Sequence, residues 1–561
     1  MSTPIKTYSY SSGPTVLMDR LCREIELEET LNELLAWDSK RCNLSPGARI
    51  KALILNVLSG KDPLVHVERF YRDQDVELLF GAGVTADDLN DDALARALDK
   101  LHEATPWKVY STLAIRAMRK LGLPIGVLHN DTTSMSLHGA YEEEADLKIV
   151  HGHSKDHRPD LKQIMLGLAV SPERIPVLAN VENGNTSDKT WNHTFIRKLR
   201  QTLSQEDWQQ LLYVADSALI TKRNLKYMKR LHLRFVSRLP DVFAVCEEVK
   251  QTAWASSGAW QEIGVLSQGP AAAQYRLQSM DRVMDGRSFR LIVVYSSNLD
   301  ERKQRALEST IQKEEERLTR QIRKLEETEF HCESDARQAL QGFQGEHRSE
   351  WFRWELTVEA VTRPAKRTGR GRPKKEEPSP METVYVPKLG SFTREEAAVE
   401  AEKRLLSTFV LISNGEADRY SDTDLLRAYK GQDAAETRFR LLKDPQLVGG
   451  VYLKTPDRIE ALGIVLVMAL LLYGILEYRI RQQLDQQEKP FRVPGRSRDY
   501  KPTGQVLLLM LQQIKVLLIQ YEDHRERLLT DNADDLARRV VEMAGYDMSI
   551  YNASPVEMTS C

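Results

Sequence analysis

The run IGVLHND, at residues 125–131, opens the stretch of sequence that decides the fold. The segments before it show helical periodicity, whereas two more short apolar runs, QIMLGLAV and IPVLANVENGN, follow it. A helical pattern, capped by Ser187 or Asp188, then leads to a further apolar run, LLYVAD, at 211–216. The nearly continuous apolar character of this last run predicts a strand that is buried on both faces. We therefore expect an α/β core in which three strands are followed by a helix and a fourth strand.

Acidic residues lie where a metal site would need them. Asp131 ends the first apolar run, Asp216 ends the run LLYVAD, and Glu436 lies in the helical stretch YKGQDAAETRFRLLK at 429–443. Each aspartate taken alone is more often a turn or capping residue. Carboxylate oxygens are the ligands that Mg²⁺ prefers, and three of them, converging from two strand ends and a helix, hold two ions about 4 Å apart. Together they predict a Mg²⁺-dependent nuclease or strand-transfer enzyme.

The stretch at 429–443 also carries a polar stripe. At roughly 100° per residue, five of its side chains fall within about 60° of one another around a helix. These side chains are Tyr429, Gln432, Glu436, Arg440 and Lys443. We expect one continuous helix here, weakened by roughly 1 kcal/mol by Gly431 in its interior. A helix face of this composition is usually only a solvated surface, so the stripe by itself leaves a role in DNA contact open.

Asp131, Asp216 and Glu436 resemble the DDE catalytic triad of RNase H-like bacterial insertion-sequence transposases. The stripe resembles the YREK signature of this group, in which Tyr, Arg, Glu and Lys are separated by two, three and six residues. The chain has each of these spacings, with Gln432 where Arg is usual. The strings HGHSKDHRPDLKQ and LISNG and the apolar helix RIEALGIVLVMALLLY also look like this group.

The resemblance implies a cut-and-paste transposase that nicks the ends of its element and closes them as hairpins. The catalytic residues, which would also hold two Mg²⁺ ions or Mn²⁺ in their place, would be Asp131, Asp216 and Glu436. The residues that contact DNA near the cut would be Tyr429, Gln432, Arg440 and Lys443. The partners would be double-stranded DNA, as terminal inverted repeats and as target, and a second copy of the chain in a homodimeric synaptic complex.

A chain of 561 residues is too long for one core. We expect a helical N-terminal domain at 1–118, the first part of an RNase H-like core at 119–240, a mixed β/α insertion at 241–406, the second part of the core at 407–490, and a C-terminal helical segment at 491–561. The N-terminal domain is acidic overall, and the resemblance makes it a reader of transposon ends, with dimerisation or packing as the alternative. In the last segment, residues 502–522 are expected to form one amphipathic helix.

The insertion separates Asp216 from Glu436 by 220 positions. It contains a linker, RPAKRTGRGRPKKEEPSP, at 363–380, which is too rich in Pro, Gly and charge to pack. Arg370 and Arg372 of this linker resemble an AT-hook core, whose arginines lie along a narrow minor groove. Nonspecific attraction to the DNA backbone is the alternative. Two strand-like runs that precede the linker are joined by Asp-Gly, a favoured hairpin turn.

Charge and cysteine content limit the class of protein. The net charge is only −2, so binding to nucleic acid must rest on a local basic patch. The five cysteines are scattered and form no CxxC pair, which argues against a disulfide framework or a zinc site and favours a reducing cytoplasm. The N-terminus lacks the apolar core of a signal peptide. The apolar run at 461–476 is shorter than the roughly 20 residues that span a membrane, so we expect a buried helix and no membrane partner.

Three histidines, His151, His153 and His157, lie in a polar loop without a cysteine partner. We therefore expect this loop to lie beside the active site and not to form a metal centre. Lys155 in the same loop is a candidate for phosphate contact.

Two other functions remain open. Another RNase H-like DNA nuclease, such as a resolvase, would need neither the long insertion nor the tyrosine and lysine that flank Glu436. A catalytically silent DNA-binding derivative would be expected to lack one of the three acids, and this chain keeps all three.

Overall fold

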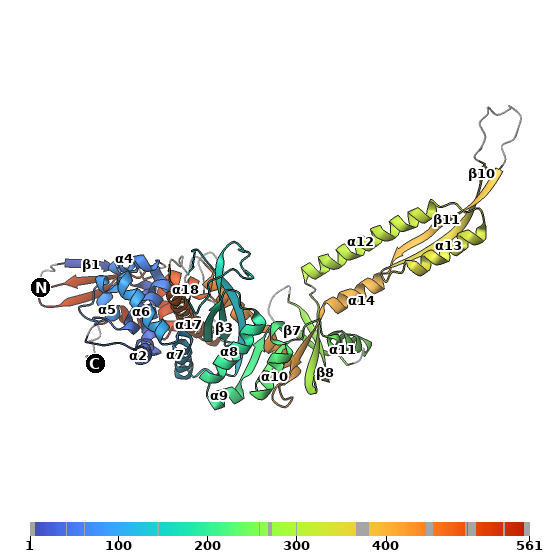
Figure 1. Ribbon diagram of the computed structural model, residues 1–561. Helices are drawn as coiled ribbons and strands as arrows, with labels where there is room; N and C mark the ends of the chain where they lie inside the picture. Colours follow the sequence, from blue (N-terminus) through green and yellow to red (C-terminus); the bar gives the residue numbers. More distant parts are fainter. Residues whose placement is uncertain are drawn as a thin grey trace, which may run out of the picture. The chain divides into compact units, whose positions relative to one another are not determined.

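The computed structural model describes residues 6–40, 42–60, 62–142, 145–256, 259–266, 272–298, 300–365, 381–444, 453–487, 491, 501–530 and 533–554 (Figure 1). By the contacts among its residues, the chain divides into two compact units. The first unit joins Met1–Pro240 to Ile412–Cys561, and the second comprises Asp241–Leu411. The N-terminal helices, the α/β core and the C-terminal segment thus share the first unit.

Helices fill the N-terminal part of the first unit, which is blue in Figure 1. They are α1 (Gly13–Glu24), α2 (Leu27–Leu34), α3 (Pro46–Leu55), α4 (Val67–Arg72), α5 (Val76–Phe80), α6 (Asp91–Glu103) and α7 (Pro106–Lys120). Local sequence sets their limits, as α3 shows: the side chain of Ser45 accepts a hydrogen bond from the amide of Ala48, and Pro46 occupies the first turn, where an amide would have no partner. The helical prediction for this region is confirmed.

The α/β core follows in the predicted order. Its strands are β2 (Val127–Leu137), β3 (Lys162–Val170), β4 (Pro176–Asn183), β5 (Leu212–Ala215) and β6 (Arg234–Arg238), in the sheet order β4-β3-β2-β5-β6. β3 is antiparallel to both β2 and β4, whereas β5 is parallel to both β2 and β6. The helices α8 (Asp188–Thr202) and α9 (Gln205–Gln210) connect β4 to β5, and α10 (Lys222–Arg230) connects β5 to β6.

One strand is longer than its apolar run indicates. We expected the first strand to end at Asp131, but β2 continues to Leu137. The second half of β2 pairs with β3, and the last pair joins Leu137 to Lys162. The side chains of Thr132 and Thr133 in this half are buried. β-branched threonine fits a pleated, half-buried surface, and an apolar pattern does not reveal this preference. Asp131 therefore lies inside the strand and not at its end.

The polar stripe does not lie on one helix, so that prediction is wrong. α15 (Asp422–Lys430) ends at Gly431, and α16 (Asp433–Leu442) begins after Gln432. A Cβ atom at Gly431 would lie 2.9 Å from Cε1 of His129, because the chain passes close to β2 at this point. The stripe is therefore divided, with Tyr429 on α15 and Glu436 on α16.

A long apolar helix, α17 (Pro456–Gln487), packs against α3, α6, α7 and β4. It is the one helix of the described residues that is long and apolar enough to cross a membrane, but 89% of its most apolar stretch is buried inside the fold. The run at 461–476 is buried, as expected. Glu477 of α17 forms a buried ion pair of 2.8 Å with Arg438 of α16, and this pair ties the two helices together.

The C-terminal segment is not purely helical. In place of the single helix expected at 502–522, α18 (Gly504–Leu511) is followed by the strands β13 (Val516–Gln520) and β14 (Arg525–Leu529). β13 also pairs with β1 (Lys6–Tyr10), so segments near both ends of the chain form one antiparallel sheet. Local periodicity does not reveal a pairing between such distant segments. The helix α19 (Asp535–Met543) packs against α17 and α18.

In the second unit, α11 (Ala244–Ala255) accompanies the strands β7 (Gln261–Val265), β8 (Gln274–Met284) and β9 (Arg287–Ser296). The predicted hairpin turn between β8 and β9 is confirmed, because Asp285 and Gly286 have φ values of 48° and 70°. The remaining elements of this unit are α12 (Glu301–Glu326), α13 (Glu333–Glu346), β10 (Phe352–Pro364), β11 (Met381–Arg394) and α14 (Glu396–Leu406). β12 (Thr408–Ser413) then leads back into the first unit. Arg370 and Arg372 lie outside the described residues.

Candidate active site

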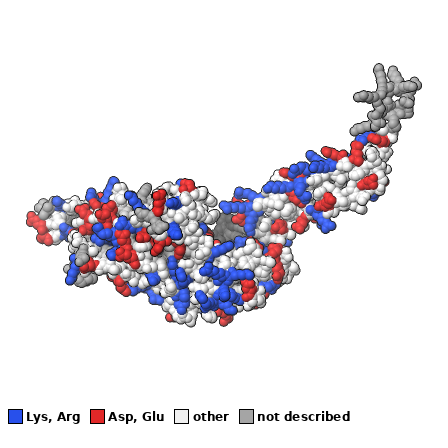
Figure 2. Space-filling model, viewed as in Figure 1, with Lys and Arg blue, Asp and Glu red and all other residues white. Residues whose placement is uncertain are grey.

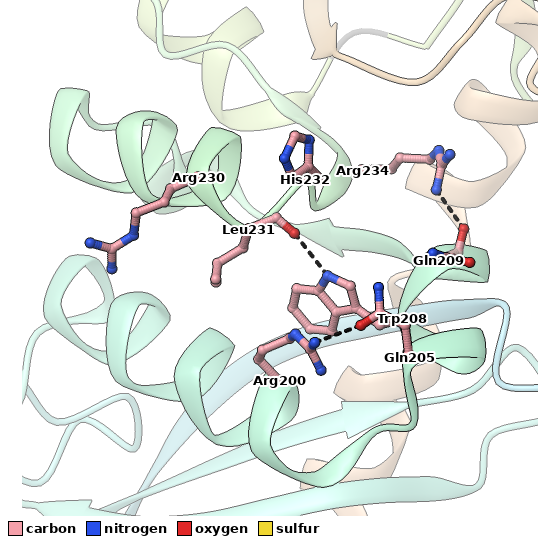
Figure 3. A pocket seen from close by; sticks show the side chains of 8 residues that line it. All are labelled: Arg200, Gln205, Trp208, Gln209, Arg230, Leu231, His232 and Arg234. Carbon is pink, nitrogen blue, oxygen red and sulfur yellow. Dashed lines mark hydrogen bonds between the residues drawn. The ribbon is translucent and has the colours of Figure 1, made fainter.

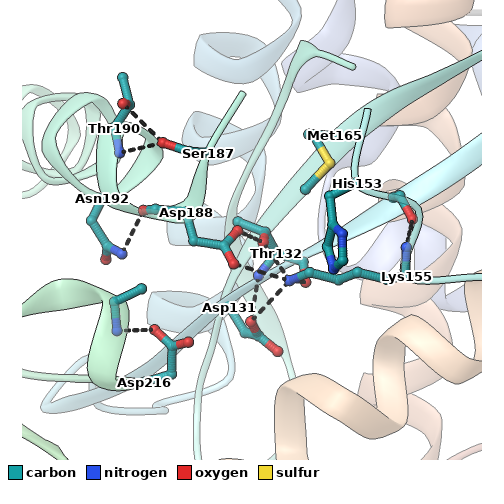
Figure 4. A network of polar contacts seen from close by, with 12 residues as sticks. Asp131, Thr132, His153, Lys155, Met165, Ser187, Asp188, Thr190, Asn192 and Asp216 are labelled. Carbon is teal, nitrogen blue, oxygen red and sulfur yellow. Dashed lines mark hydrogen bonds and ion pairs between the residues drawn. The ribbon is translucent and has the colours of Figure 1, made fainter. Parts of the chain in front are cut away.

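Two of the predicted acids, Asp131 and Asp216, lie next to each other in the core, at the point where β5 ends. β2 and β5 are parallel neighbours in the sheet, with Asn130 opposite Ala215. Asp131 and Asp216 directly follow these two residues, so they also lie side by side. Asp216 caps a short helical turn, where its Oδ1 accepts a hydrogen bond from the amide of Ala218 at 3.1 Å. Figure 4 shows both carboxylates in one network of polar side chains. The two aspartates are therefore held on adjacent strands of the sheet.

The surroundings of Asp131 and Asp216 disfavour the ionised form of both carboxyls. Burial raises the pKa of Asp131 to about 6; the carboxylates of Asp216 and Asp188 add to this rise, whereas the ammonium of Lys155 and the amide of Thr132 oppose it. Burial also raises the pKa of Asp216, and Asp188 contributes again. Neighbouring carboxylates with so little compensating charge are stabilised by a bound cation. Their oxygens are also the donors that divalent ions such as Mg²⁺ prefer.

Asp188 is a site residue that sequence reasoning missed. We left open whether Ser187 or Asp188 caps α8, and the structure shows that Ser187 does, with its side chain accepting the amide of Thr190. The carboxylate of Asp188 instead accepts a hydrogen bond of 2.5 Å from the hydroxyl of Thr132 on β2. The only signal in the sequence was the presence of two capping residues in succession, of which a helix needs one.

Lys155 lies between two of the carboxylates (Figure 4). Its Nζ is 3.5 Å from Oδ2 of Asp188 and 3.9 Å from Oδ1 of Asp131. The same ammonium donates to the carbonyl and the hydroxyl of Thr132 at 2.8 and 2.9 Å. The backbone amide of Lys155 donates to the hydroxyl of Ser134, which holds the histidine loop against β2. The loop thus lies beside the candidate site, as expected.

Glu436 lies in the first turn of α16 and is exposed. Burial raises the pKa of Tyr429 of α15, and the charge of Arg238 opposes this rise. The carboxylates of Asp216 and Glu436 both add to the rise, so Tyr429 lies within electrostatic reach of each of them. Within the described residues, no three His, Cys, Asp or Glu side chains come close enough together to hold a metal ion. A ligand set that joins Glu436 to the aspartates therefore stays a prediction.

The basic residues of the stripe have different surroundings. Arg440 is exposed, whereas Lys443 forms an ion pair with Asp156 of the histidine loop. Arg438, which is not part of the stripe, is fully buried, pairs with Glu477, and donates to the carbonyl of Arg174 at 2.6 Å. Arg438 therefore holds in place the helix that carries Glu436.

Comparison with known proteins defines the class of this chain. A family model described as a transposase DDE domain matches residues 122–472, which is more than half of the chain. The chain therefore belongs to the DDE transposase family, whose members generally use divalent metal ions. Residues 15–115 match a second model, a domain of unknown function (DUF4277).

Two further comparisons add little to this assignment. A search of curated proteins finds no match. The solved synaptic complex of piggyBac transposase with hairpin DNA is similar at 10% sequence identity and a TM-score of 0.35, over 88% of this chain and 79% of that chain. A likeness this distant carries no functional argument.

Proposed function

We propose that this transposase moves an insertion sequence by cut-and-paste, cleaving DNA at Asp131, Asp216 and Glu436 in an RNase H-like core. The observation that carries the proposal is the parallel pairing of β2 and β5, which brings Asp131 and Asp216 next to each other where β5 ends. The raised pKa values of these two carboxyls add support, because they identify a place where a cation is stabilising.

Divalent ions would be held by Asp131 and Asp216, with Glu436 completing the set for two Mg²⁺ or Mn²⁺ ions. When bound, such ions lower the pKa of an attacking water or 3′-hydroxyl and stabilise the leaving oxygen. The protein's own groups prepare the site for them. The amide of Thr132 donates to Oδ1 of Asp131 at 2.7 Å and fixes its orientation. Lys155 lowers the pKa of the same carboxyl and so favours its ionised form.

Double-stranded DNA would be the substrate, both as terminal inverted repeats and as target. Tyr429, Arg440 and Lys443 would grip the strand next to the cut, whereas Gln432 would offer a hydrogen bond without charge. Cleavage would proceed through hairpin ends in a complex of two protein copies. The linker arginines Arg370 and Arg372 would add contacts along the minor groove.

The rival functions are less well supported. A resolvase-like nuclease would not need the second unit, yet the transposase family model extends through it, from residue 122 to residue 472. A catalytically silent derivative would not need to keep Asp131 and Asp216 paired on adjacent strands and close enough to repel each other.

A cleavage assay tests the proposal. The substrate is a linear duplex that carries the inverted repeats flanking the gene, and the control is the same duplex with scrambled ends. We expect nicks and then hairpins at the element ends in Mg²⁺ or Mn²⁺, and neither in EDTA. Folded protein that binds these ends but cuts them with neither ion would contradict the proposed activity.

A further inference from the structure

Positive charge gathers over α8 and α10 of the first unit, as Figure 2 shows on one face of the molecule. α10 has the sequence KRNLKYMKR, with five basic residues and no acidic one. Arg223, Lys226, Lys229 and Arg230 of this helix are all exposed. In the parts of the chain that the structure describes, none of these four makes an ion pair with an acid. By contrast, the exposed Arg116 of α7 forms an ion pair with Glu33.

α8 extends this basic face. Arg197 is exposed on α8, and the two helices are joined near their starts by a hydrogen bond from the side chain of Asn224 to the carbonyl of Lys189. Further along, the rings of His193 and Tyr227 stack with centroids 4.2 Å apart. Burial lowers the pKa of His193, and so do the charges of three arginines. These arginines are Arg223, Arg197 and Arg230. Arginines of both α8 and α10 therefore lie close enough to His193 to lower its pKa together.

A pocket of about 390 Å³ lies at the far end of both helices. Arg200 at the end of α8 and Arg230 at the end of α10 line it, together with Trp208, whose indole nitrogen donates to the carbonyl of Leu231 at 2.9 Å (Figure 3). The guanidinium of Arg200 lies 5.4 Å from the centre of the Trp208 ring. Trp208 is itself buried, so its ring supports the guanidinium of Arg200, whose positive charge suits a DNA phosphate.

The near end of this face is the candidate active site. Asp188, the first residue of α8, lies within electrostatic reach of Asp216, and α10 begins six residues after Asp216. The 15 residues of α8 span about 22 Å at 1.5 Å per residue. That length corresponds to roughly six base pairs of duplex at 3.4 Å per pair.

We propose that the α8–α10 face binds the phosphate backbone of a DNA duplex that extends about six base pairs from the cleavage site. The proposal rests on the proposed transposase function and adds to it a surface separate from the α15–α16 stripe. Duplex DNA fits better than an acidic protein, because the face begins at the acids that would cut DNA and runs in one direction away from them. Its basic side chains serve binding and take no part in the cleavage chemistry.

The test replaces Arg223, Lys226 and Lys229 together by Gln and measures affinity for a 30-base-pair duplex as salt is varied. The matched control replaces Arg116, Arg119 and Lys120 of α7 by Gln, which removes the same charge from exposed side chains that are paired with acids. Each phosphate contact adds about 0.9 to the slope of log affinity against log salt. We expect the α10 variant to lose about 2 to 3 from this slope and to bind about tenfold or more weakly, and the control to change neither.

The possible results separate this proposal from the proposed function. Wild-type protein that does not bind DNA at low salt would contradict both. Wild-type binding with an unchanged slope in the α10 variant would overturn the α8–α10 face alone. A second variant, Arg197→Gln with Arg200→Gln, changes only α8, so it tests the same face even if the first variant unfolds α10 locally. The slope of log affinity against log salt should fall by about 1 to 2 in this variant.

Discussion

Asp131 shows how the candidate site works at the scale of a single residue. Its pKa of about 6 lies above the roughly 3.9 of an unfolded chain, so between these values the folded protein binds more protons than the unfolded one. The ionised carboxylate therefore lowers stability most above pH 6, and this penalty shrinks as the pH falls from about 6 to about 3.9. The side chain is 34% exposed, and solvent screening limits the penalty to roughly 1–2 kcal/mol.

Asp131→Asn should consequently stabilise the protein while it abolishes cleavage. At pH 8 and without divalent ions, we expect a gain of roughly 1–2 kcal/mol in the free energy of unfolding, which falls to about a third of that at pH 4.5. Denaturant unfolding at the two pH values measures this difference. Asp160→Asn is the control, because Asp160 is ion-paired with Arg158 and its loss should bring no gain. If the Asp131 variant is no more stable than the wild type at pH 8, the ionised carboxylate does not destabilise the folded protein.

Asp188 acts through its neighbours, so its loss should be milder than the loss of a metal ligand. Asp188→Asn removes a charge beside Lys155 and weakens the hydrogen bond from Thr132. Groups that orient the ligands of a metal typically contribute 10- to 100-fold, and we expect nicking to slow by about that factor. Single-turnover nicking rates at saturating Mg²⁺ measure it. A rate as low as that of Asp216→Asn would instead make Asp188 a ligand in its own right.

At the scale of elements, the helix that carries Glu436 is positioned by contacts that the sequence does not reveal. The buried pair of Arg438 with Glu477 anchors α16 to α17, and α15 ends at Gly431, where the chain passes close to His129. The sequence did identify Gly431 as a weak point in the helix. It could not show that His129 lies opposite, because that contact joins residues about 300 positions apart. Local pattern likewise failed for the strand β13, whose partner β1 is at the other end of the chain.

Lys443 forms an ion pair with Asp156 of the histidine loop. Lys443 could therefore contact DNA, as proposed, or serve only to hold this loop, and two substitutions distinguish these roles. Both Lys443→Ala and Asp156→Asn remove the pair, but only the first removes a charge available to phosphate. If Lys443 contacts DNA, we expect Lys443→Ala to lower the yield of hairpins per nicked end several-fold and Asp156→Asn to leave that yield nearly unchanged. Equal loss in both variants would assign Lys443 to the loop alone.

At the scale of the whole molecule, the strand order of the core was predictable, because buried runs and caps are local signals. Which strands are neighbours is set by the sheet, where β5 lies beside β2 and brings Asp216 next to Asp131. Composition was less informative: a net charge of −2 conceals a helix, α10, with five basic residues and no acidic one. The participation of Asp188 and Lys155 in the site could not be predicted, since it depends on how α8 and the histidine loop meet β2.

Cleavage by the three neutralised variants tests the central claim most directly. Asp131→Asn, Asp216→Asn and Glu436→Gln each remove a carboxylate charge with little change in shape, and each should reduce Mg²⁺-dependent nicking of element ends at least about 1,000-fold. Binding of the ends, measured on the same preparations, should stay within a few-fold of wild type, and Asp160→Asn should nick normally. If any of the three variants retains near-wild-type nicking in Mg²⁺, the assignment of the active site to these residues is wrong.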